Sequence, residues 1–173
     1  MNTRLPALLA LAAALALPAV RAQAPAPGPQ GASRGTIAVT FENPEKFTDL
    51  KMDRMPRERE RQSLLAELRE TLEREAPRRL PAGTRLEVTI TDVDMAGEFE
   101  PQHGVNLANV RIVRDMYPAR INLSFRLSDA SGKTLKEGTR KLVSSFTTAE
   151  PMRTDHLKRE KDLLEEWLSR EFA

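Results

Sequence analysis

The sequence of 173 residues contains no cysteine. A chain without thiols has no disulfide framework, thiolate zinc site, iron–sulfur cluster, cysteine nucleophile or lipid anchor on an N-terminal cysteine. Aromatic residues are scarce, at 5% of the chain, and their spacing is that of core positions rather than of a stacking surface for bases or sugars. A Gly-x-Ser-x-Gly elbow, a His-Glu-x-x-His pair and a phosphate-binding glycine loop are absent too. The sequence therefore predicts no catalytic residues.

Long hydrophobic runs are also lacking, with one exception near the start of the chain. The apolar run 8–17 follows a short positive segment that contains Arg4. It is too short for a membrane-spanning helix, which needs about 20 apolar residues. Val20 and Ala22 fit the small-residue pattern of a signal peptidase site. We therefore expect residues 1–22 to be a signal peptide, cleaved after Ala22, that exports the protein to the periplasm; an uncleaved anchor is the alternative.

A large excess of one charge is missing as well. The chain has 27 Lys and Arg against 25 Asp and Glu, with a net charge of +2 and a pI near 9.1. Cleavage would remove Arg4 and Arg21 but no acid, leaving 25 of each sign. A neutral mature chain has no global field that attracts nucleic acid or anionic lipid. Residues 23–35, with three Pro and three Gly, are predicted to form a disordered linker, and 36–173 a single domain.

Apolar residues alternate in several short segments, which is the period of half-buried strands. The clearest is 120–128, and Asp129 to Gly132 then form a hairpin turn. Leucines at helical spacing predict two helices. The predicted strands are 36–41, 85–92, 110–115, 120–128 and 133–146, and the helices are 56–76 and the segment from 154 onward. This pattern favours an α+β two-layer sandwich, with a mainly antiparallel sheet of four to five strands and both helices on one face.

Two aspartates at the end of strand 85–92 form the first candidate site. If the alternation of that strand continues, Asp92 and Asp94 point inward, where a carboxylate is costly unless it is paired or ligating. They could cap the strand end, pair with a basic residue or bind a hard cation. With Gly97 they match three positions of an EF-hand loop, but His103 stands where that loop needs glutamate, so the template fails.

The second candidate is Lys161, preceded by Glu160, in the last helix. Its spacing from Leu157 and Leu164 places Lys161 on or beside the buried stripe. The lysine could lay its stem over apolar surface, form an ion pair with Asp92 or Asp94, or act as a functional amine. If the protein binds a metal, the candidate ligands are Asp92, Asp94, Glu98 and His103.

Four short segments resemble a bacterial family of exported proteins known as domain of unknown function 3016. The resemblance extends over residues 36–172 and implies export and a single domain. It supplies no catalytic residues, because none are established for that family. The four segments are Val39 to Asp49, Thr91 to Gly97, Tyr117 to Ile121 and Glu160 to Trp167.

These observations favour a non-enzymatic envelope module that binds an unknown protein or small ligand. The predicted ligand-binding residues are Asp92, Asp94, Gly97 and Lys161, at the end of the sheet. We expect no cofactor, no nucleic acid partner and no transmembrane segment in the mature chain. The alternative is a metal-dependent hydrolase that uses the Asp92 and Asp94 strand end.

Overall fold

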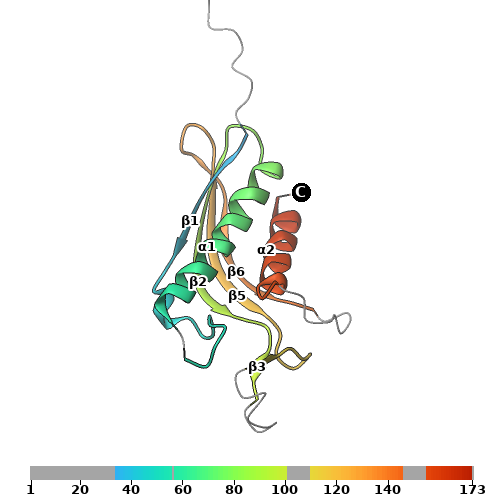
Figure 1. Ribbon diagram of the computed structural model, residues 1–173. Coiled ribbons are helices and arrows are strands. Elements are labelled where there is room, and N and C mark those ends of the chain that lie inside the picture. The colour runs from blue at the N-terminus through green and yellow to red at the C-terminus, as the bar shows by residue number, and fades with distance from the viewer. Residues whose placement is uncertain (1–33, 56, 101–109, 146–154, 173) are drawn as a thin grey trace, which may run out of the picture. The chain divides into compact units, whose positions relative to one another are not determined.

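The computed structural model describes residues 34–55, 57–100, 110–145 and 155–172. The predicted signal peptide and most of the predicted linker lie outside these residues, as does His103. The strands are β1 (Thr36–Phe41), β2 (Arg85–Asp94), β3 (Glu98–Phe99), β4 (Arg111–Ile112), β5 (Arg120–Ser128) and β6 (Thr134–Val143); the helices are α1 (Glu58–Glu75), α2 (Lys158–Glu171) and the short 3-10 turns η1 (Pro44–Lys46) and η2 (Ala76–Arg78) (Figure 1).

The main sheet has four strands in the order β1-β2-β5-β6. The pairs β2–β5 and β5–β6 are antiparallel, whereas β1 and β2 are parallel because α1 provides the crossover between them. A second, two-stranded sheet pairs β3, which the sequence did not predict, with β4, which lies within the predicted strand 110–115. The α+β prediction is confirmed.

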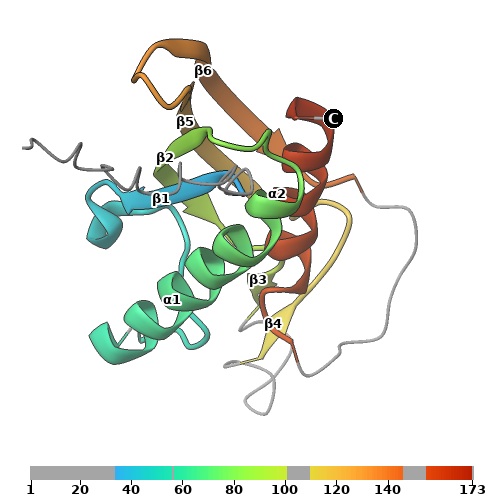
Figure 2. The same cartoon turned by 90° about the horizontal axis from the view of Figure 1, so that it is seen from above.

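Both helices cover the same face of the sheet and lie side by side (Figure 2). They run in the same direction, because Glu67 pairs with Lys161 and Arg74 pairs with Glu165 further along both helices. Their apolar stripes meet the inward side chains of the sheet in one core. The fully buried side chains include Leu64, Leu68, Leu72, Leu86, Ile90, Ile121, Leu123, Leu164 and Leu168.

An irregularity in β2 corrects the expected orientation of the two aspartates. The pairing of β2 with β5 shifts between Ile90 and Asp92. Such a bulge adds one residue and reverses the faces of the residues that follow. Val93 therefore takes the core position, fully buried, while Asp92 and Asp94 lie half-buried on the other face. The prediction that they point inward is wrong for this reason.

Candidate functional site

One end of the main sheet brings together polar segments that are distant in the sequence. There β2 ends, β5 begins, the β3–β4 hairpin folds back and α2 starts (Figure 1, lower part). We call this the loop end, formed by residues 48–52, 92–100, 111–120 and 155–161. The opposite end, formed by residues 75–85 and 128–134, is the turn end.

Asp92 and Asp94 bind separate partners at the loop end. The two carboxylate oxygens of Asp92 accept hydrogen bonds from the amide and the hydroxyl of Thr48, at 2.7 and 2.9 Å. Asp94 instead pairs with Arg120, which lies opposite it on β5, at 2.9 Å. Both carboxylates thus have a structural partner, and their ligand binding stays a prediction.

A buried ion pair that the sequence did not suggest lies beside them. The carboxylate of Asp49 contacts the guanidinium of Arg111 at 2.8 Å, and about nine-tenths of each side chain is buried. Arg111 also donates to the carbonyl oxygens of Gly97 and Lys51, at 2.7 and 2.9 Å. Its guanidinium lies 4.7 Å from the ring centroid of Phe99. Arg111 thereby joins β4, the end of β2 and the segment that follows η1.

Gly97 has a backbone role at this junction. Its φ of +87° is in the left-handed region, which glycine adopts without steric cost. A Cβ atom there would lie 2.7 Å from the carbonyl oxygen of Ile112. Glycine therefore allows β4 to pack closely against the turn between β2 and β3, and the Gly97 amide donates to the carbonyl of Tyr117 at 2.9 Å.

Glu160 is the most deeply buried charged group among the described residues, with 1% of its surface exposed. Its Oε1 accepts a hydrogen bond from the amide of Ala96 at 2.7 Å, while its Oε2 is buried without a hydrogen-bond partner. Burial raises the pKa of the Glu160 carboxyl, although the Ala96 amide opposes this effect. Glu160 therefore attaches the first turn of α2 to the end of β2.

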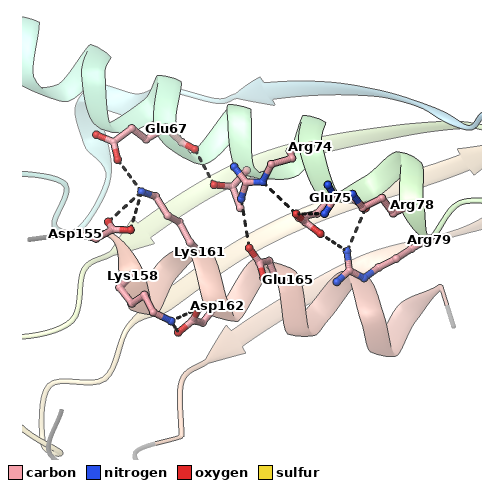
Figure 3. Close-up of polar contacts among 11 residues, drawn as sticks. Glu67, Arg74, Glu75, Arg78, Arg79, Asp155, Lys158, Lys161, Asp162 and Glu165 are labelled. Carbon is pink, nitrogen blue, oxygen red and sulfur yellow. Dashed lines mark hydrogen bonds and ion pairs between the residues drawn. The ribbon is translucent and has the colours of Figure 1, made fainter. Parts of the chain in front are cut away.

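Lys161 projects into the interface between the helices (Figure 3). Its ammonium contacts Glu67 at 2.8 Å and Asp155 at 3.0 Å, so the predicted ion pair with Asp92 or Asp94 is replaced by this one. Burial lowers the pKa of Lys161, but the two carboxylates outweigh that effect and raise it overall. The amine is accordingly held in its charged form.

Lys161 also lines a cavity of about 330 Å³ at the loop end. The wall combines charged and apolar residues, because Met52 and Leu64 line it together with the ion-paired residues. The full lining is Met52, Leu64, Glu67, Asp155, His156 and Lys161. This cavity brings one predicted ligand-binding residue, Lys161, together with five residues that the sequence did not suggest as ligands.

Three of the possible metal ligands, Asp92, Asp94 and Glu98, lie in the described part of the chain and do not form a metal-binding cluster there. Within the described ranges, no group of three or more His, Cys, Asp or Glu side chains is placed to hold an ion. Glu98 accepts a hydrogen bond from the neighbouring Phe99 amide at 2.8 Å. The position of His103 lies outside the described residues.

The sequence contained signals for two of the groups that it did not identify. Arg111 interrupts the apolar run 110–113, where a charge needs a buried partner. Glu160 lies three residues after Leu157 and four before Leu164, which is a core position of the helix. Neither signal identifies the partner, since Asp49 and Ala96 are distant in the sequence.

The sequence pattern of one protein family, described as protein of unknown function (DUF3016), matches residues 35–170. The chain belongs to this family. A search of curated proteins finds no match. The family match covers all the described strands and all of α2 except its last residue, Glu171, so the loop end lies within it.

The four segments that carry the resemblance meet at the loop end. The first supplies Thr48 and Asp49, and the second supplies Asp92, Asp94 and Gly97. The third supplies Arg120 and the carbonyl of Tyr117, and the fourth supplies Glu160. Their shared location gives each segment a structural task in joining the sheet to α2 and to the β3–β4 hairpin.

No helix in the described part of the chain is both long and apolar enough to cross a membrane.

Proposed function

We propose that this protein is an exported, non-enzymatic binding module that takes a protein segment or small ligand at the loop end. The observation that supports this function is the cavity beside Lys161. It offers an ammonium, two carboxylates, an imidazole and apolar surface within about 330 Å³. A few polar groups set in a partly apolar hollow are typical of ligand sites.

The charge states in the cavity argue for binding rather than catalysis. Lys161 is a poor nucleophile or base because its raised pKa keeps the amine protonated. The hydrolase alternative has less support, since Asp92 and Asp94 have separate protein partners instead of a shared opening between them. Binding is therefore the function that the arrangement favours.

The binding proposal is tested with two lysine variants on the same helix. Lys161→Met removes the ammonium in the cavity, whereas Lys158→Met removes one that pairs with Asp162 and does not line the cavity. Proteins captured from an envelope extract and small molecules that raise the melting temperature are compared for both variants and the wild type. Loss of a ligand with Lys161→Met alone supports the proposal, and identical ligand sets for all three proteins contradict it.

Export is tested separately, on the complete chain expressed in a Gram-negative host. The expected product is a periplasmic protein whose N-terminal residue, by sequencing, is Gln23. A chain that keeps Met1 or stays in the cytoplasm contradicts export, without bearing on the binding cavity.

A further inference from the structure

The two outer strands of the main sheet differ in how their open edges are protected. β6 carries the charged residues Lys136, Glu137, Arg140 and Lys141 along its length. β1 has the sequence Thr-Ile-Ala-Val-Thr-Phe, without charge or proline, and its pairing with β2 contains no bulge. Natural proteins usually place charges, prolines or bulges on an exposed edge strand to prevent its pairing with another strand. β1 lacks all of them, and it lies at the margin of the sheet (Figure 1).

The backbone of β1 presents unused polar groups at this margin. The amide of Thr36 donates to the carbonyl of the residue before β2, and the amide of Glu42 donates to the carbonyl of Ile90 in β2, at 2.9 Å each. Because successive residues of a strand face opposite sides, the amides and carbonyls of Ile37, Val39 and Phe41 point to the open edge. Among the described strands, β1 has β2 as its sole neighbour.

The side chains of the same three residues are also incompletely covered. Ile37, Val39 and Phe41 are half-buried, although they pack against the core. A groove of about 420 Å³ runs between β1 and α1, with Leu65 and Ala66 in its wall. A strand added at this edge would place its own side chains over the groove and complete their burial.

We propose that the edge of β1 pairs with β1 of a second copy of this chain. In an antiparallel pair centred on Val39, this residue lies opposite the partner's Val39, and Ile37 lies opposite the partner's Phe41. All three outward residues then donate and accept hydrogen bonds in a single register. The strand is therefore complementary to itself, and the two sheets become one.

Charges at the ends of β1 select the same antiparallel arrangement. Arg34 precedes the strand and Glu42 follows it, and both are exposed. In the proposed register, Arg34 lies diagonal to the partner's Glu42, where opposite charges attract. Parallel pairing would instead place Arg34 near the partner's Arg34 and Glu42 near the partner's Glu42, where like charges repel. The chain's own residues 23–33 are less suitable occupants, because prolines at positions 25, 27 and 29 supply no amide donors.

The register is tested with two variants that change the same pair of residues. Ala38 and Thr40 alternate with the residues that pack against the core, so their side chains point to the other face of the sheet. Each lies opposite the other residue of the partner in the proposed dimer. Ala38→Lys/Thr40→Lys places like charges across the axis, whereas Ala38→Lys/Thr40→Glu places opposite charges there. Leu135→Lys, at an exposed position of β6, is the control for the other edge.

Sedimentation equilibrium is measured on a chain that begins at residue 23 and so contains the compact unit Gly31–Ala173. The wild type, Ala38→Lys/Thr40→Glu and Leu135→Lys are expected to have twice the chain mass, and Ala38→Lys/Thr40→Lys the mass of one chain. Circular dichroism verifies that every variant is folded. A monomeric wild type, equal masses for the two double variants, or dissociation by Leu135→Lys overturns the proposal. A wild-type monomer that binds a foreign extended peptide at β1 overturns it too, in favour of that partner.

Discussion

The loop end and the turn end of the sheet satisfy their charges in different ways. At the turn end, Glu75 pairs with Arg74, Arg78 and Arg79, all within four residues. At the loop end, Asp49 is 62 residues from Arg111, and Ala96 is 64 residues from Glu160.

This difference has an energetic meaning. Local pairs form as soon as a helix or turn forms, whereas distant pairs exist only when the whole domain has folded. The distant pairs are also more deeply buried. Removing one partner there leaves the other charge unpaired and shielded from solvent, which is costly. Stability at the loop end should therefore depend more strongly on single side chains.

The largest effect is expected from Arg111→Met. This change leaves the buried Asp49 carboxylate with only the more exposed Lys51, at 3.5 Å, and removes donors to two carbonyl groups. We expect the free energy of unfolding to fall by about 3 to 5 kcal/mol, as for other broken buried pairs. Urea denaturation measures it. The turn-end counterpart, Arg79→Met, should cost clearly less because Glu75 keeps two other arginines; equal losses would remove the distinction between the ends.

Gly97→Ala should have the next largest effect. The new Cβ atom meets the Ile112 carbonyl at 2.7 Å and the residue keeps a positive φ. The turn-end control is Gly132→Ala, which has a similar φ of +86° but no atom within 4 Å of the added carbon. Left-handed backbone costs an alanine about 1 to 2 kcal/mol, so Gly132→Ala should lose that amount and Gly97→Ala more. Thermal unfolding compares them, and an equal loss contradicts the close approach.

The pH dependence of stability should have opposite signs at the two ends. Burial raises the pKa of Glu160, so its contribution is present at low pH and is lost as pH rises through the raised value. Hydrogen bonds from Arg79 and Arg74 outweigh burial and lower the pKa of Glu75, so its contribution is present above the ordinary pKa and is lost as pH falls through the lowered value.

Two glutamine variants separate these contributions. In the wild type, the free energy of unfolding should decrease as pH rises above the ordinary titration range of glutamate, and Glu160→Gln should remove this decrease. Glu75→Gln should remove a decrease on the acid side. Urea denaturation at a series of pH values measures both. A wild-type pH profile that neither variant alters would show that these two groups do not titrate as the structure implies.

The smallest effects are expected from exposed ion pairs, at either end. Arg120→Ala at the loop end and Arg78→Ala at the turn end remove side chains that are 50% and 64% exposed. Each should change the free energy of unfolding by less than about 1 kcal/mol, because solvent screens such pairs. If Arg120→Ala lowers the free energy of unfolding as much as Arg111→Met does, then the position of a residue at the loop end, and not its burial, decides how much it contributes to stability.

The local elements were largely predictable. β5 has the predicted bounds Arg120–Ser128, because its alternation is regular and the Asp129 turn ends it. The leucine stripe of α1 is buried as its spacing indicated. The bulge in β2 was not predictable, since it is defined by pairing with β5, and it moved Asp92 and Asp94 to the other face.

By itself, the sequence determined the class of fold and the approximate positions of the main elements. These features depend on periodicity and on near neighbours, which any stretch of the chain contains. Only the tertiary structure decided that Glu160 binds Ala96, that Asp49 binds Arg111 and that Lys161 lies between Glu67 and Asp155. Many residues of suitable charge compete for each of these partners, and the packing of two helices on one twisted sheet selects among them.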